Sequence, residues 1–411
     1  MIPLLTGLRV VECASFIAAP SCALHLRQLG AEVIRIDPIG GGPDFHRWPL
    51  SPEGKSLYWE GLNKGKKSIA VDFSRPEGRQ LVVDLATAGG ILVTNFPRDG
   101  FLAHERLQRL RADMISVRVM GWRDGSTAVD YTVNAGIGVP YITGEGTTGD
   151  APVNHVLPAW DLITGAYAAF VTLAAERERL RTGRGCDAAI PLSDVALSAL
   201  ANMGQVAEVL TSGDRPRVGN ALFGAFGRDF RTADGERVMV VAITRRQWSG
   251  LIAALRLESA IAELEARLAV SFAREEGLRF VHREVLFPLF ERAIAALQLE
   301  QLKQLFDAND VCWSPYRTLS RALREDPRLS LASPWFDDIV HPSGRRYPAA
   351  GPAVTITGAE RLAETRSPQL GEHTDEVLCE LLALDAATIA QLRREGLVAG
   401  PVAESRQSPP T

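Results

Sequence analysis

Short apolar runs alternate with helical patterns over the first two hundred residues of the chain. Runs such as Leu8–Val11 and Glu32–Ile36 are mostly apolar and only four or five residues long, which is typical of strands buried in a parallel sheet. The stretches Ala19–Leu29 and Pro76–Ala88 repeat apolar residues at helical spacing, and Gly30 follows the first of them as a helix stop signal. This alternation predicts βαβ units and an α/β fold with a parallel sheet.

The pattern changes twice further along the chain. Residues 121–160 are rich in Gly, Thr, Asp and Pro and show no helical period, so we expect a long loop there, which is usually functional. A long helix is expected over Asp161–Arg181, with its most apolar window, Leu162 to Ala175, buried. After residue 214 a hairpin with an Asp234-Gly235 turn precedes a mostly helical stretch.

The domain organisation follows from these changes, because β and α patterns return near the C-terminus. We expect a large α/β domain whose first part spans residues 1–215 and a smaller α+β domain over 216–325. A return segment, 326–411, is expected to complete the large domain, with a frayed Ser/Pro-rich tail over 405–411.

Composition and charge exclude several functional classes. Lys and Arg total 45 against 49 Asp and Glu, a formal net charge of −4, and the Arg residues are scattered, so we expect no nucleic-acid partner. The five cysteines lie far apart without a CxxC motif, which argues against a zinc site or disulfides and favours a reducing cytoplasm. No leader pattern and no charge-free apolar stretch of about 18 residues is present, so we expect no membrane partner.

Asp161 is the sharpest chemical candidate, because it stands where the irregular region meets the apolar helix. One interpretation is a helix N-cap, for which Asp is favoured. The other is a nucleophile toward an activated acyl group, with nearby backbone N–H groups holding the oxyanion. His155 and His373 are the histidines of most interest by position, but the sequence offers no convincing Ser/His/Asp triad.

The basic run Lys64, Lys66 and Lys67 only partly resembles a P-loop, because Lys67 stands where Ser or Thr would bind magnesium. ATP hydrolysis is therefore rejected. The run is interpreted either as a solvated loop or as a site that meets a phosphate by charge alone.

Several motifs occur in the order typical of the class III CoA-transferases (CaiB/BaiF type), and the chain resembles that family from residue 7 to about residue 400. The motifs are Gly7-Leu-Arg-Val-Val-Glu12, Leu29-Gly-Ala-Glu-Val-Ile-Arg-Ile-Asp-Pro38, Leu62-Asn-Lys-Gly-Lys-Lys-Ser-Ile-Ala-Val-Asp72, Thr94-Asn-Phe-Pro97, Asp161-Leu-Ile-Thr-Gly165, Arg181-Thr-Gly-Arg-Gly185 and Leu370-Gly-Glu-His-Thr-Asp-Glu-Val-Leu378. Further stretches, in loops expected to line the pocket, resemble a branch that moves CoA within one dicarboxylate. They include Ile39–Asp44, Arg47–Pro49, Val129–Asn134 and Val153–Asp161.

The resemblance implies a fold and a set of site residues. The fold is a Rossmann-like large domain with a smaller α+β domain, in an interlocked homodimer. Asp161 is the implied catalytic nucleophile, and Arg47, Tyr131 and His155 are the expected substrate-binding residues. The implied CoA-binding residues are Phe16, Ile17, Ala18, Val71, Asp72, Asn95, Phe96 and Arg98. Pro38 stands where family members often carry Arg, so Arg98 or Lys66 is expected to supply the missing phosphate charge.

The implied reaction is CoA transfer through an aspartyl-CoA thioester. The leading hypothesis is intramolecular transfer of CoA from the C1 to the C4 carboxyl of mesaconate. No metal and no cofactor is expected beyond the CoA carried by the acyl-CoA substrate. The runner-up is intermolecular transfer between an acyl-CoA and a free carboxylic acid. A third interpretation is a catalytically silent CoA-binding protein in which Asp161 only caps its helix.

Overall fold

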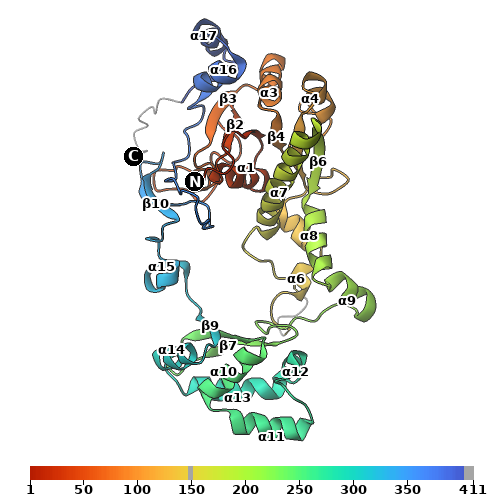
Figure 1. Cartoon of the computed structure of the whole chain (residues 1–411), viewed down its shortest axis with the longest axis vertical. Coiled ribbons are helices and arrows are strands. Elements are labelled where there is room, and N and C mark those ends of the chain that lie inside the picture. The colour runs from red at the N-terminus through yellow and green to blue at the C-terminus, as the bar shows by residue number, and fades with distance from the viewer. Residues whose placement is uncertain (147–150, 402–411) are drawn as a thin grey trace. The chain divides into compact units, whose positions relative to one another are not determined.

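The computed structural model describes residues 1–146 and 151–401, which form two compact units (Figure 1). The first unit comprises Met1–Ile137, Val156–Ala207 and Leu331–Thr411, and the second comprises Gly138–His155 and Glu208–Ser330. The first unit is therefore assembled from both ends of the chain. The tail 405–411, for which we predicted fraying, lies outside the described residues.

A seven-stranded, largely parallel sheet forms the centre of the first unit, in the order β12-β3-β2-β1-β4-β5-β6. Strands β1 to β6 are parallel to their neighbours, and β12 pairs antiparallel with β3. The order 3-2-1-4-5-6 is that of doubly wound sheets, which bind ligands at the carboxyl ends of the strands where the order reverses, here between β1 and β4. The strands are β1 (Arg9–Cys13), β2 (Glu32–Pro38), β3 (Lys67–Val71), β4 (Ile91–Thr94), β5 (Ile115–Met120), β6 (Cys186–Pro191) and β12 (Val398–Ala399).

Helices cover both faces of this sheet, as the near-continuous apolar character of its strands requires. One face packs an apolar core against α3, α4, α16 and α17, and α1 and α7 lie side by side on the other face (Figure 1). The helices of the unit are α1 (Ala18–Gln28), α2 (Leu57–Leu62), α3 (Pro76–Gly89), α4 (His104–Leu110), α5 (Asp130–Gly136), α7 (Ala159–Thr182), α8 (Leu192–Asn202), α16 (Thr374–Leu382) and α17 (Ala386–Arg394). A two-stranded hairpin of β10 (Phe336–Val340) and β11 (Arg346–Ala350) completes it.

The second unit is built on a three-stranded antiparallel sheet of β7 (Phe226–Arg231), β8 (Arg237–Ala242) and β9 (Cys312–Pro315). Its core is aromatic, with Phe226 centred 4.5 Å from Phe290 and 5.3 Å from Trp248. Its helices are α6 (Val139–Ile142), α10 (Arg245–Leu255), α11 (Glu258–Leu268), α12 (Glu276–Val281), α13 (Arg283–Ala295), α14 (Leu299–Ala308), α15 (Leu319–Glu325) and the 3-10 turn Pro327–Leu329. Helix α9 (Gln205–Ser212) crosses the boundary between the two units along the chain.

Two expectations from the sequence pattern are wrong. The region 121–160 is not a continuous loop, because the short helices α5 and α6 lie within it; such short helices carry too few turns for an apolar period. The apolar window of α7 is only half buried. Thr164, Gly165 and Ala168 lie in the core, whereas the opposite helix face exposes apolar side chains. The exposed side chains are Leu162, Ile163, Tyr167 and Phe170.

The close contact of α1 with α7 depends on Gly165. A Cβ atom at this position would lie 1.9 Å from the Ser21 hydroxyl oxygen and 2.7 Å from the Ala18 carbonyl oxygen. No helix among the described residues is long and apolar enough to cross a bilayer.

Gly165→Ala is expected to lower the free energy of unfolding by about 1–3 kcal/mol, because the added methyl forces α1 and α7 apart. Gly277→Ala is the matched control, since it also replaces a helical glycine but meets no atom within 4 Å. Urea denaturation of both variants checks the prediction. Equal stability of the two variants would contradict the close packing of α1 on α7.

Candidate active site

Two loops meet where the strand order reverses, one after β1 and one after β4. Asn95 joins them, because its side-chain oxygen accepts the Ser15 N–H at 3.2 Å and its amide donates to the Ser15 carbonyl at 3.0 Å. Phe16 follows with a φ of 70°, a left-handed conformation that is uncommon for a non-glycine residue. Its backbone N–H donates to the Asp44 carboxylate at 2.7 Å. The predicted CoA-binding residues Phe16 to Ala18 thus lie beside Asn95, at the ligand-binding edge of a doubly wound sheet.

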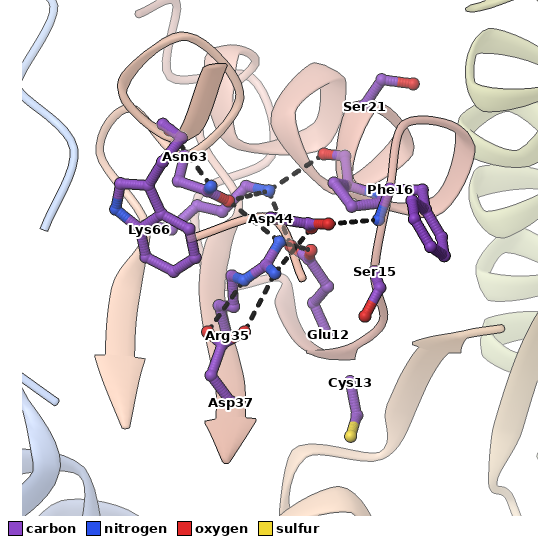
Figure 2. Close-up of polar contacts among 12 residues, drawn as sticks. Glu12, Cys13, Ser15, Phe16, Ser21, Arg35, Asp37, Asp44, Asn63 and Lys66 are labelled. Atoms are coloured by element: carbon purple, nitrogen blue, oxygen red, sulfur yellow. Dashed lines mark hydrogen bonds and ion pairs between the residues drawn. The ribbon is translucent and has the colours of Figure 1, made fainter. Parts of the chain in front are cut away.

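A buried charge network lies beneath this loop (Figure 2). We call it the Arg35 network; it consists of Glu12, Arg35, Asp37, Asp44, Asn63 and Lys66. The Arg35 guanidinium has no exposed surface and bonds Glu12 at 2.8 Å, both oxygens of Asp37 at 2.9 Å and Asp44 at 2.9 Å. Lys66 donates to Glu12 at 2.7 Å.

The network holds its charges by mutual pairing. Burial raises the pKa of the Glu12 and Asp44 carboxyls, against the opposing effect of the cations beside them. Burial disfavours the charge on Arg35, but the surrounding carboxylates outweigh it and raise the pKa of the guanidinium. Asp44 therefore connects the buried cation to the backbone of Phe16.

The basic run does not form a solvated loop, and none of its charges is free for a phosphate. Lys66 is buried in the Arg35 network and also donates to the Pro20 carbonyl at 2.9 Å. Lys64 is buried and bonds the Gly61 carbonyl at 2.8 Å. Lys67 pairs with three glutamates. The expectation that Lys66 supplies the phosphate charge is accordingly wrong.

Asp161 stands in the first turn of α7, and its helix begins two residues earlier than predicted. The N-cap position belongs to Pro158, so the interpretation of Asp161 as the N-cap is wrong. Capping comes instead from Asp130, at the start of α5, whose Oδ2 accepts the N–H of Trp160 at 2.7 Å and that of Asp161 at 3.0 Å. Asp130 is buried and thus fixes the backbone that carries Asp161.

The environment of Asp161 raises its pKa to about 7. Burial is the largest cause and the negative charge of Asp130 adds to it, whereas Arg47 acts in the opposite direction. Near neutral pH this carboxyl is therefore divided between its neutral and charged forms. A carboxylate of raised pKa in a mostly buried position suits nucleophilic attack on an acyl group.

Arg47 lies on the loop that begins at Asp44 and extends over two aromatic rings. Its guanidinium carbon is 5.5 Å from the ring centre of Phe16 and 5.5 Å from that of Tyr58. The Ser56 hydroxyl donates to the Arg47 carbonyl at 2.6 Å and thereby fixes the loop. The Arg47 side chain remains exposed, so it can bind a carboxylate with two parallel hydrogen bonds.

The other predicted CoA-binding residues lie on neighbouring loops at the same sheet edge. Phe96 follows Asn95 and packs edge-on against Phe73 and Phe101. Val71 ends β3 and is buried, and Asp72 follows it and accepts the N–H and hydroxyl of Ser74. Arg98 is exposed and pairs with Asp187 at 3.1 Å.

The remaining candidates have separate surroundings. Tyr131 is exposed on α5, and its hydroxyl donates to the Val156 carbonyl at 3.0 Å. His155 belongs to the second unit, so its substrate-binding role stays a prediction. His373 accepts the Ser68 N–H at 3.2 Å and holds the returning chain against β3, which is a structural role.

Sequence reasoning missed Asp130, Tyr58 and the Arg35 network. A charge in the middle of a buried strand, as with Glu12 in β1 and Arg35 in β2, is the signal that marks such a network, since buried charges need partners. Within residues 1–146 and 151–401 there is no group of three or more His, Cys, Asp or Glu that could hold a metal ion.

Comparison with known proteins supplies the family. The chain matches the CoA-transferase family III over residues 5–374. It is 48% identical over 404 residues to 2-methylfumaryl-CoA isomerase of Chloroflexus aurantiacus, covering 97% of this chain and 98% of that protein. It is 29% identical to succinate–glutarate CoA-transferase of Agrobacterium fabrum, covering 93% and 97%. The solved structure of a CAIB/BAIF family protein from Brucella suis superposes with a TM-score of 0.75 at 26% identity, covering 93% of this chain and 100% of that one.

Asp161→Asn is expected to stabilise the chain at neutral pH. Between about pH 4 and pH 7 the folded chain keeps a proton on Asp161 that the unfolded chain loses, so the parent loses stability as pH rises through this window. The variant lacks this loss, and its advantage should level off above pH 7 at about 4 kcal/mol, because each of the roughly three pH units between the two pKa values is worth about 1.4 kcal/mol. Urea denaturation at several pH values measures it, with Asp99→Asn at an exposed position as control. An advantage that is the same at pH 4 and pH 8 would contradict the raised pKa.

Proposed function

Because the chain belongs to CoA-transferase family III, we propose that it is an isomerase that converts 2-methylfumaryl-CoA into 3-methylfumaryl-CoA by intramolecular CoA transfer. The observation that carries this proposal is the placement of Asp161 in the first turn of α7, where the carboxyl is mostly buried. Its pKa is about 7, and the positive charge of Arg47 acts to lower that pKa. The isomerase that is 48% identical over nearly the whole chain supports the choice of substrate.

The first half of the reaction transfers CoA to the enzyme. The Asp161 carboxylate attacks the C1 thioester carbonyl, the carbon–sulfur bond breaks, and CoA leaves as the thiolate, so that a mixed anhydride between Asp161 and the acyl group remains. The thiolate then attacks the aspartyl carbonyl of this anhydride. The products are an aspartyl-CoA thioester and a free dicarboxylate, which stays in the site.

The second half returns CoA to the other end of the acid. The C4 carboxylate attacks the aspartyl thioester and expels the thiolate, which then attacks the C4 carbonyl and releases Asp161. The thioester energy is conserved only if water is excluded, since water would hydrolyse either intermediate. The sole carried group is the CoA of the acyl-CoA substrate.

Contacts to the substrate and to CoA are proposed as well. Arg47 binds the free carboxylate of the substrate, with Tyr131 and His155 as further contacts. The backbone at Phe16, Ile17 and Ala18 faces CoA, since the first N–H groups of a helix such as α1 lack intrahelical partners and suit anionic oxygens. Val71, Asp72, Asn95, Phe96 and Arg98 complete the proposed CoA site.

The assembly is proposed to be an interlocked homodimer. The exposed apolar face of α7 supports this proposal, because adjacent exposed residues such as Ile163, Tyr167 and Phe170 form the kind of surface that a second chain covers. The five cysteines are free thiols, which supports a cytoplasmic location. The segments 1–215 and 326–411 are proposed to act as the CoA-binding domain, and 216–325 as the small domain.

The purified protein is expected to convert 2-methylfumaryl-CoA into 3-methylfumaryl-CoA without any added acid. When labelled mesaconate is added to the mixture, its label should not appear in the CoA esters, because the free acid does not exchange with the bound one. Chromatography of the esters checks both points, with Asp161→Ala as the inactive control. Turnover only after a second acid is added would instead assign an intermolecular CoA-transferase.

Arg47→Met is expected to raise KM by about 30-fold, the effect of losing about 2 kcal/mol of charge-assisted hydrogen bonding. Because Arg47 lowers the pKa of Asp161, the acid limb of the kcat/KM profile should also move to higher pH. Arg346→Met, at an exposed ion pair of the β10–β11 hairpin, is the control. A profile that stays in place would show that Arg47 does not face Asp161 in the working enzyme.

A further inference from the structure

Tyr58 on α2 carries a buried hydroxyl without a hydrogen bond. The oxygen has essentially no exposed surface and no hydrogen-bond partner among the described residues. Its ring lies beneath the Arg47 guanidinium, with 5.5 Å between the guanidinium carbon and the ring centre. Four charged groups act on it electrostatically, namely Asp44, Arg47, Asp161 and Arg35. The Tyr58 side chain therefore contacts one group proposed to bind the substrate, Arg47, and lies within electrostatic range of the proposed nucleophile, Asp161.

The rest of α2 is firmly held, so the position of this hydroxyl is fixed by its surroundings. Ser56 caps the helix by accepting the Trp59 N–H at 3.1 Å. The Trp59 indole donates to the Pro368 carbonyl at 3.0 Å, and its ring packs 4.7 Å from the Arg35 guanidinium carbon. None of these contacts involves the Tyr58 hydroxyl. Its removal would leave the anchoring of the helix unchanged.

A buried polar group without a partner costs stability, and native structures contain few of them. Such a group beside a nucleophile is typical of a site in which the missing bond is made only with the substrate. A phenol can supply such a bond as a neutral donor, and Ser, Asn or Tyr side chains serve in this way in oxyanion holes.

We propose that the Tyr58 hydroxyl is a catalytic residue that donates a hydrogen bond to the oxygen that becomes negative when Asp161 attacks the thioester carbonyl. This inference rests on the proposed function of Asp161. In the step, a bond forms between the Asp161 oxygen and the carbonyl carbon, and the carbonyl electron pair moves onto its oxygen. The hydroxyl keeps its proton throughout and only shares it with that oxygen. When the carbonyl re-forms, the carbon–sulfur bond breaks and the electron pair leaves with the thiolate.

Two properties of the site suit the hydroxyl to this role. Burial raises the pKa of Tyr58, and the carboxylates of Asp44 and Asp161 act in the same direction, so the phenol remains a donor at neutral pH. Arg47, whose side chain is exposed, is left to bind the substrate's free carboxylate. The two donors then serve different oxygens of one substrate, and their loss should affect different kinetic constants.

The test is Tyr58→Phe, which removes one oxygen atom and keeps the ring beneath Arg47. We expect kcat for 2-methylfumaryl-CoA to fall by about 100-fold, with KM changed by less than about threefold, because the bond exists only in the transition state. The midpoint of thermal unfolding should stay the same or rise, because the variant removes a buried group that has no partner. Tyr316→Phe, which removes a hydroxyl in the second unit, is the control and should leave kcat unchanged.

Each other result contradicts the inference in a recognisable way. A rise in KM with unchanged kcat would place the hydroxyl on the substrate's free carboxylate and overturn the proposal. A lowered unfolding midpoint together with lost activity would assign Tyr58 a structural role. If the parent protein turned over neither 2-methylfumaryl-CoA alone nor succinyl-CoA with a second acid, the proposed function would fail as well. Normal turnover by both the parent and Tyr58→Phe would overturn only the role of Tyr58.

Discussion

The Arg35 guanidinium is the interaction on which the geometry of the site depends. It has no exposed surface, and it is bonded by carboxylates from β1, from β2 and from the loop that follows β2. A single buried cation thereby fixes three segments of chain against one another. Asp44 transmits this constraint in two directions, to the left-handed backbone of Phe16 and to the turn that carries Arg47. Removing one partner from such a network leaves buried charge uncompensated, which typically costs about 3–5 kcal/mol.

The surroundings of Asp161, the proposed nucleophile, show how the fold can raise the pKa of a carboxyl group at the start of a helix. A carboxylate at the start of a helix would ordinarily be stabilised by the helix dipole and acidic. Here two N–H groups of the first turn, those of Trp160 and Asp161, are already bonded by Asp130, which also adds a negative charge nearby. Burial and this charge together raise the pKa of Asp161 to about 7. The result is a carboxylate that is available at neutral pH yet poorly stabilised, which favours its attack on a carbonyl.

Much of the first unit could be predicted from the sequence, because its strands are short, apolar and regularly separated by helices. The strand predicted over Glu32–Ile36 and the helix predicted over Pro76–Ala88 both begin at the predicted residue and end within two residues of the predicted end. The sequence marks Asp161 as a candidate because it lies between an irregular region and an apolar helix. The sequence does not mark Asp130, because its partners are backbone N–H groups thirty residues or more away, a contact that no local pattern encodes. Similarly, Glu12 and Arg35 lie at buried positions of two different strands, and their pairing becomes visible only when β1 and β2 lie side by side. The half-exposed face of α7 could not be separated from its buried face, because both are apolar.

The proposed reaction makes Asp161 the carrier of CoA, and trapping the covalent intermediate tests this role. The protein is mixed with 2-methylfumaryl-CoA, treated with hydroxylamine, digested and analysed by mass spectrometry. An activated acyl group on Asp161 reacts with hydroxylamine to leave a hydroxamate, so we expect a hydroxamate at Asp161 that depends on the substrate. Efficient turnover with an unmodified Asp161 peptide, or a hydroxamate at another carboxylate, would contradict it.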